Sequence, residues 1–145
     1  MGQLHELRLR SNAFVANMDK HIEDSIVDSA DELIKLNRKQ MMSSVNAEDK
    51  PLIHLKTGSP YLSKSYARKT GKLKPNLYES GGFQKEMFLE PRFPEYFIRS
   101  FNQVGKYLVD MYDNFFGVSP ENQPEAKKIT FANFYERYKK NVLRK

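Results

Sequence analysis

The strongest pattern in the chain is a stripe of apolar residues that recurs every three or four positions across residues 12–36. This spacing puts the apolar side chains on one face, so it predicts one amphipathic α-helix with Ser11 or Asn12 as its cap. At about 1.5 Å per residue the helix would be roughly 37 Å long, more than a small domain requires. We expect it to pack either in its own core or against a neighbouring subunit. The stripe consists of Val15, Met18, Ile22, Ile26, Ala30, Leu33 and Leu36.

Residues 42–78 show no clear period and are punctuated by glycine and proline. Ser59 followed by Pro60 is typical of a helix start, so a short helix is predicted from there through about Lys69, with Gly71 just beyond its end. A loop-like region this long is unusual inside a compact domain, and such regions are more often functional than idle. The sequence therefore predicts an extended loop or arm.

Two alternating stretches follow and predict a small antiparallel sheet. Apolar and polar positions alternate over residues 83–90 and again over residues 96–101, with "EPRFPE" between them. This order predicts a hairpin whose loop of about four to six residues contains Pro91 and Pro94, where a missing N–H does no harm.

The last third of the chain predicts helices. Steps of three and four from Val104 to Phe115 favour a helix, with Gly117 as its C-cap. "SPE" at residues 119–121 restarts a helix, which Pro124 must interrupt or begin. A final helix over residues 130–143 carries a stripe that we expect in the core: Phe131, Phe134, Tyr135, Tyr138 and Val142.

These elements predict one α+β domain over residues 1–145: a long N-terminal helix, an extended basic loop or arm over residues 42–78, a small antiparallel sheet with a hairpin, and two or three C-terminal helices. A chain of 145 residues buries enough surface to fold without disulfides or a metal.

The only adjacent glycine pair, Gly81-Gly82, raises the question of a phosphate-binding loop. Such loops place their glycines between a strand and the N-terminus of a helix. Here a strand is expected after the pair, and no GK[ST] motif is present. The pattern therefore favours a structural turn at Ser80, Gly81 and Gly82, in which glycine supplies a positive φ.

Composition removes several classes of chemistry. The chain has no cysteine and only three histidines, which lie far apart in sequence. It contains no G-x-S-x-G or H-E-x-x-H motif, and the acids of the first helix fall on its polar side. We therefore expect no enzyme activity and no cofactor or metal. No apolar stretch approaches the roughly 18 residues of a membrane span, so we expect no membrane contact and a protein made and kept inside a cell, or packaged from one.

Charge is concentrated in one stretch. Between Lys50 and Tyr78 every charged residue is basic, and this local excess is larger than the net charge of +6 of the whole chain. Such a patch attracts polyanions or an acidic protein surface, although most charge runs are only solvated faces. The centre of the patch combines cations with a tyrosine able to stack on a base, and its candidate contact residues are Lys64, Tyr66, Arg68, Lys69, Lys72 and Lys74.

From Leu33 to Glu121 the order of short motifs resembles a family of small virion proteins of tailed bacteriophages, which act in head–tail joining, the neck or tail completion. The motifs are an Asn and Gln ending a helix, a "YS…Y…K" segment, a "T-G-x-F" turn and a late "FGL-T-x-E". The matching positions are Asn37, Gln40, Ser59, Tyr61, Tyr66, Lys69, Leu77, Ser80, Gly81, Phe83, Phe116, Gly117, Val118, Ser119 and Glu121. Ser80 replaces the usual Thr, and Gly82 stands where the family often has an acid.

The resemblance implies a non-enzymatic subunit of an oligomeric ring at the head–tail junction. It implies portal, connector or tail proteins as neighbours, and localisation in the virion, with the host cytoplasm as the place of assembly. It also implies that the basic stretch is an inter-subunit arm. The alternative is a small nucleic-acid-binding module that uses residues 64–74, and the two are compatible because a neck ring surrounds passing DNA.

Overall fold

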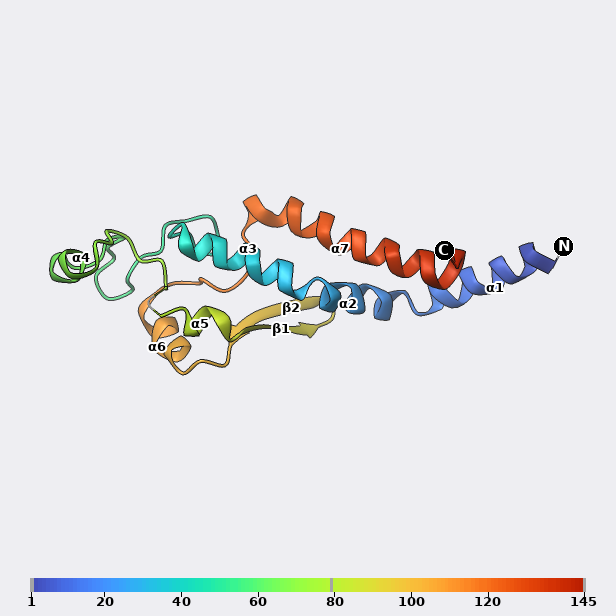
Figure 1. The fold of residues 1–145 in the computed structure, drawn as a ribbon, viewed down its shortest axis with the longest axis horizontal. Helices are drawn as coiled ribbons and strands as arrows, with labels where there is room; N and C mark the ends of the chain where they lie inside the picture. The colour runs from blue at the N-terminus through green and yellow to red at the C-terminus, as the bar shows by residue number, and fades with distance from the viewer. Residues whose placement is uncertain (1, 79, 145) are drawn as a thin grey trace.

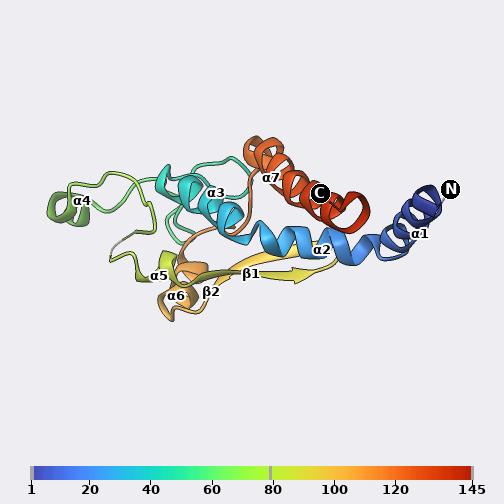
Figure 2. The same cartoon turned by 45° about the vertical axis from the view of Figure 1, so that its right-hand side comes forward.

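The computed structural model describes residues 2–78 and 80–144 and has an α+β fold, as predicted. A rod of three helices forms the middle layer, with α7 packed on one side and a two-stranded hairpin on the other (Figure 1; Figure 2). The elements are α1 (Gly2–Ala16), α2 (Met18–Asp28), α3 (Ala30–Met42), α4 (Lys64–Thr70), α5 (Gly82–Lys85), β1 (Met87–Arg92), β2 (Glu95–Ser100), α6 (Val104–Met111), the 3-10 turn η1 (Pro120–Asn122), α7 (Gln123–Tyr138) and the π-helical end η2 (Lys139–Leu143).

The single helix predicted over residues 12–36 is wrong in its extent and continuity. Helical structure begins at Gly2 and ends at Met42, and it is interrupted at Asn17 and Ser29. At both breaks a polar side chain bonds the carbonyl four residues earlier: Asn17 Nδ2 donates to Ala13 O at 2.9 Å, and Ser29 Oγ donates to Ser25 O at 2.6 Å. Such side-chain bonds compete with the backbone ladder and bend helices.

Of the predicted stripe only Leu33 is buried, and Met18, Ile22, Ile26, Ala30 and Leu36 are half-buried. Leu33 is fully buried in the core, whereas Val15 is 63% exposed because α1 extends beyond the layers of the body. The only buried residue in α1 is Phe14. Its ring stacks on His21 at 4.0 Å and meets Phe134 and Tyr138 edge-on at 5.6 Å, so one aromatic cluster fastens α1 to the C-terminal helix.

The hairpin is tighter than predicted. β1 and β2 pair antiparallel with Leu89 opposite Ile98, and Phe93-Pro94 is the whole connection. Pro91, expected in the loop, lies inside β1 opposite Tyr96. A proline is accommodated there because each strand of a two-stranded sheet has a free edge that needs no N–H.

The strand predicted over residues 83–90 is wrong in its first half. Phe83 lies in α5, a single helical turn, and β1 begins only at Met87. Phe83 is buried against Phe115, with ring centroids 5.9 Å apart, and Ser100 Oγ donates to Phe83 O at 2.8 Å. Packing of this aromatic side chain on the core therefore overrides the local alternation.

Two buried amides of α3 hold the segment that joins α6 to α7. Asn37 Nδ2 donates to Phe115 O at 2.8 Å and to Gly117 O at 2.9 Å, and Gly117 N donates to Asn37 Oδ1 at 3.2 Å. Gln40 Nε2 also donates to Gly117 O at 2.9 Å, while its Oε1 accepts from Ser119 N at 2.9 Å. We call Asn37 and Gln40 the amide clamp. It satisfies backbone groups that no regular element pairs.

The C-terminal helices agree with the prediction in part: Ser119-Pro120 starts the helical turn η1, as expected. α6 ends at Met111, so Gly117 is not its C-cap; Gly117, at φ +118, belongs to the clamped segment. α7 starts at Gln123, with Pro124 in its first turn, where its missing N–H costs nothing. Of the predicted aromatic stripe, Val142 is buried, but Phe131 is 68% exposed because α7 contacts the body along only part of its surface.

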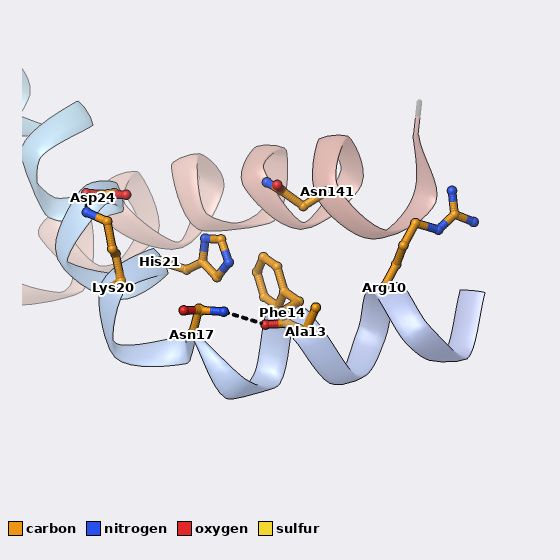
Figure 3. Close-up of a pocket in the computed structure, with 8 residues that line it drawn as sticks. All are labelled: Arg10, Ala13, Phe14, Asn17, Lys20, His21, Asp24 and Asn141. Atoms are coloured by element: carbon orange, nitrogen blue, oxygen red, sulfur yellow. Dashed lines mark hydrogen bonds and ion pairs between the residues drawn. The ribbon is translucent and has the colours of Figure 1, made fainter. Parts of the chain in front are cut away.

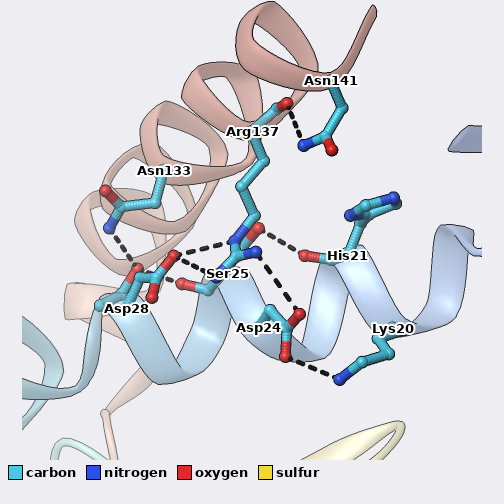
Figure 4. A network of polar contacts seen from close by, with 9 residues as sticks. Lys20, His21, Asp24, Ser25, Asp28, Asn133, Arg137 and Asn141 are labelled. Carbon is cyan, nitrogen blue, oxygen red and sulfur yellow. Dashed lines mark hydrogen bonds and ion pairs between the residues drawn. The ribbon is translucent and has the colours of Figure 1, made fainter. Parts of the chain in front are cut away.

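A polar network joins α2 to α7 (Figure 4). The Arg137 guanidinium contacts Asp28 Oδ2 at 2.8 Å and Asp24 Oδ2 at 3.4 Å. Asn133 Nδ2 donates to Ser29 Oγ at 2.8 Å, so the side chain that breaks the rod also receives a bond from the neighbouring helix. Serine at this buried position leaves space for α7 to lie close to the rod.

Within the part of the chain that the structure describes, no helix is both long and apolar enough to cross a membrane.

Candidate functional site

The basic stretch projects from the body at the end of the molecule opposite α1 (Figure 1). None of residues 56–74 is buried, and we call these residues the projecting arm. The arm carries six cations and no acid: Lys56, Lys64, Arg68, Lys69, Lys72 and Lys74. A segment that buries none of its own side chains gains little hydrophobic stabilisation by itself.

The sequence builds α4 inside the arm with ordinary capping chemistry. Ser63, not Ser59, is the N-cap, and its Oγ accepts from Tyr66 N at 3.3 Å. Gly71 follows the last turn at φ +71, beyond the helix end as predicted. The N-cap therefore lies four residues later than predicted, and Pro60 belongs to the preceding loop.

The first part of the predicted 42–78 loop belongs to the body. Leu52 is fully buried, Ala47 N donates to Asn114 O at 2.8 Å, and Leu55 N donates to Met111 O at 2.9 Å. The base of the arm is closed by a bond of 2.9 Å from Leu62 N to Leu73 O. The arm thus leaves a fixed base rather than a long free loop.

The six predicted contact residues all lie on the arm, but in two settings. Lys72 Nζ donates to Tyr78 O, and Lys74 Nζ lies 6.0 Å from the centre of the Tyr61 ring. Lys64, Arg68 and Lys69, all exposed on α4, form no ion pair with any residue that the structure describes. Their charges are therefore directed at solvent.

Apolar side chains of the arm are exposed beside these cations. Leu73 is 72% exposed and Tyr61 is 60% exposed, Tyr66 is exposed to a smaller extent, and Tyr78, just beyond the arm, is also exposed. From the sequence, Tyr66 was identified because it lies among cations and Tyr61 through the resemblance, whereas Leu73 and Tyr78 were not identified. A mixed cationic and aromatic surface of this kind is suited to a protein surface or a polyanion.

The predicted turn at Ser80 to Gly82 joins the arm to α5. Gly81 has φ +80, a left-handed conformation, and a Cβ there would lie 3.0 Å from the Tyr78 ring. Gly82 is the first residue of α5, and Gly82 N lies 3.5 Å from Ser80 Oγ. A helix does follow the pair, contrary to the expected strand, but it has only one turn and no described strand precedes it.

A groove of about 320 Å³ lies between the α1–α2 junction and η2 (Figure 3). Its polar side chains largely bond within the protein: Asn17 to Ala13 O, Lys20 to Asp24, and Asn141 to Arg137 O. His21 stacks on Phe14 rather than facing a nucleophile. The groove is where three helical segments meet, and its described residues do not assemble an acid–base pair.

Shifted pKa values follow local contacts rather than a reaction centre. The hydrogen bond from Lys50 lowers the pKa of Glu48, and the one from Arg92 lowers the pKa of Glu90. Burial raises the pKa of Tyr96 and of Tyr112, with Tyr66 adding to the shift at Tyr112. Glu48 and Tyr112 line one groove, whereas Glu90 and Tyr96 lie on the hairpin, so the four groups do not gather at one site as the perturbed groups of a typical active site do.

Comparison of the chain with protein-family models, with curated proteins and with solved structures found no match. Among residues 2–78 and 80–144, no three His, Asp or Glu side chains gather as metal ligands do. The function is therefore inferred from the exposed arm and from the distribution of charge on the body.

Proposed function

We propose that this protein is a non-enzymatic structural subunit of a tailed-bacteriophage virion, which assembles into an oligomeric ring at the head–tail junction as a neck, connector or tail-completion protein. The observation that carries the proposal is the projecting arm, which combines ordered backbone, exposed apolar side chains and six cations without a buried residue of its own. Side chains of this kind are stabilised when a neighbouring subunit covers them.

A second observation supports the proposal. Two motifs that carry the resemblance to phage virion proteins lie far apart in sequence and meet in the fold: the amide clamp of Asn37 and Gln40 binds the backbone at Gly117 and Ser119. The resemblance therefore involves residues that position one another. A head-to-tail contact made by an arm closes into a ring when the rotation between subunits allows it.

The test is the mass of the purified full chain by light scattering after size exclusion, at low and moderate salt, with and without DNA. We expect one discrete mass of several subunits that persists without DNA, and electron microscopy of that species gives its symmetry. A monomer at every protein concentration and salt, alone and with DNA, would contradict self-assembly into a ring.

A matched pair of variants ties the assembly to the arm. Lys64→Glu with Arg68→Glu reverses two exposed arm cations, and Lys127→Glu with Lys128→Glu makes the same change in charge on exposed residues of α7. We expect the arm variant to lose the large species and the α7 variant to keep it. Equal masses for both variants would remove the arm from the interface.

The alternative function is a nucleic-acid-binding module, favoured by the same cations beside the exposed Tyr61 and Tyr66 rings. Lysines and arginines release counterions from phosphates, and tyrosine rings stack on bases. This function predicts a monomer that binds single-stranded DNA with an affinity that falls steeply with salt.

Fluorescence anisotropy of labelled single-stranded DNA across a salt series tests the alternative. Alanine at Lys64, Arg68 and Lys69 removes three phosphate contacts, which would lower the slope of log K against log salt by about two for single strands. An unchanged slope would show that DNA is bound elsewhere or only through the protein's net charge.

A further inference from the structure

The surface that receives the arm must carry negative charge, and the body contains one such surface on α2 and the start of α3. Residues 18–32 contain six acids and a single lysine. Arg137 binds two of these acids, Asp24 and Asp28, and Lys20 also binds Asp24. The other four form no ion pair with any described residue: Asp19, Glu23, Asp31 and Glu32.

Three of these free acids follow one another along the rod. Asp19, Glu23 and Asp31 belong to one row of positions spaced by four, and the fourth member of that row is Val27, which is 47% exposed. Positions four apart lie on one face of a helix, which places Asp19, Glu23 and Val27 together on α2. Asp31 follows in the first turn of α3, just beyond the break at Ser29, and we call these four residues the acidic row. At about 1.5 Å per residue the row is roughly 18 Å long, which accommodates α4 with its roughly 10 Å.

We infer that the acidic row is the docking surface for the projecting arm of a second copy of this chain. The inference rests on the proposed function and names the two surfaces that would meet. The acidic row places an exposed apolar residue, Val27, among acids, and the arm places Tyr66 among cations. The two surfaces are thus complementary in charge and each offers an apolar contact at its centre.

The contact joins two molecules rather than two parts of one. In both views the arm extends away from the body, and α3 separates it from α2 (Figure 1; Figure 2). Contact between two arms is unfavourable because each carries six cations and no acid. A donor surface at one end and an acceptor surface further along the same chain give a head-to-tail arrangement, which builds rings.

The absence of cysteine from the chain permits a direct test by disulfide trapping. Ser65→Cys places one thiol on α4, and Val27→Cys, on a separate full-length chain, places one in the acidic row. The control partner is Ala132→Cys, an exposed position on α7. Mixed under mild oxidation at low salt, the Ser65 and Val27 variants should give about ten-fold more mixed dimer than the Ser65 and Ala132 variants, since complementary charge raises encounter rates by at least that factor.

Charge reversal identifies the force involved. When Glu23→Lys and Asp31→Lys are added to the Val27→Cys chain, the mixed dimer should no longer form in excess over the Ala132→Cys control. When Lys64→Glu and Arg68→Glu are then added to the Ser65→Cys chain, the excess of mixed dimer should return. Helix content and melting temperature of each variant establish that it is folded. The inference would be overturned by any of three results: equal yields of mixed dimer with Val27→Cys and with Ala132→Cys, an excess of mixed dimer that survives charge reversal, or a majority of Ser65–Ser65 dimers.

The experiments distinguish failure of the proposed ring from failure of the proposed docking surface. A discrete ring mass combined with no preference for the acidic row would leave the ring and exclude this docking surface. A strong preference for the acidic row in a chain that forms only open-ended or dimeric species would support the docking surface and exclude the closed ring.

Discussion

Replacement of Asn37 by alanine tests whether the amide clamp holds the body together. The side chain is fully buried and makes three hydrogen bonds to backbone groups of residues 115–117. Without it, Gly117 O keeps its bond from Gln40, but Phe115 O and Gly117 N lose the partners described above. Each buried polar group left without a partner costs about 1–3 kcal/mol, so the two groups together should lower the free energy of unfolding of Asn37→Ala by about 2–6 kcal/mol.

Urea unfolding followed by circular dichroism measures this loss. The midpoint should fall with an unchanged m-value, and Tm should fall by roughly 10 °C for a chain of this size. The matched control is Asn12→Ala on the exposed surface of α1, whose side chain has no hydrogen bond to a described residue. Alanine has the higher helix propensity, so the control should be neutral or slightly stabilising.

A double-mutant cycle sharpens the test. Asn37 and Gln40 both donate to Gly117 O, so either single change leaves this carbonyl one donor and the double change leaves it none. The double variant should therefore lose about 1 kcal/mol or more beyond the sum of the singles. A free energy of unfolding for Asn37→Ala within about 0.5 kcal/mol of the value for the Asn12→Ala control would refute the reasoning, since surface changes stay within that range.

Three further predictions concern the turn, the network between helices, and high pH. Gly81→Ala should destabilise the fold by about 1–2 kcal/mol because of its positive φ, and Gly82→Ala, its control inside α5, should not. Arg137→Ala should lower the free energy of unfolding by about 1–2 kcal/mol, and Arg137→Lys should lower it less, because lysine keeps the charge but lacks the planar guanidinium. Urea midpoints distinguish the two glycine variants and the two Arg137 variants. Burial raises the pKa of Tyr96 and Tyr112, so their contribution to stability is intact below pH 10 and is lost as pH rises further. Ultraviolet absorbance should show two tyrosines that titrate at higher pH than the others, while the urea midpoint falls over the same range. Normal titration of every tyrosine would contradict this prediction.

Periodicity predicted the class of the fold and most of its elements because apolar spacing reports which faces are buried. It did not predict the breaks at Asn17 and Ser29, where a side chain bonds the carbonyl four residues earlier, because Ser25 makes the same kind of bond inside the continuous helix α2. It also placed Phe83 in a strand, because a single turn of helix is too short to show a period. Phe131 was expected in the core because an aromatic stripe does not reveal how much of a helix its neighbours cover.

The charge of the candidate site could be predicted from the sequence. The cations of residues 64–74 were identified from their run without acids, and all of them lie on the arm. The acids of the first helix were also visible in the sequence, on its polar side. Which of them are free was not, because Asp19 and Glu23 are mixed in sequence with Asp24 and Asp28, which Arg137 binds across more than one hundred residues. Only the fold separates paired acids from free ones.

The attachment of α1 has a consequence for how the molecule opens. This helix contributes one buried side chain, Phe14, and the break at Asn17 separates its hydrogen-bond ladder from that of α2. Besides this cluster α1 contacts only the neighbouring η2 and α2 to any extent, so we expect loss of the cluster to release its fifteen residues before the clamped body opens. In the language of native-state hydrogen exchange, α1 and the body are two cooperative units of unequal stability, and amides of α1 exchange through an opening that the rest of the chain does not share.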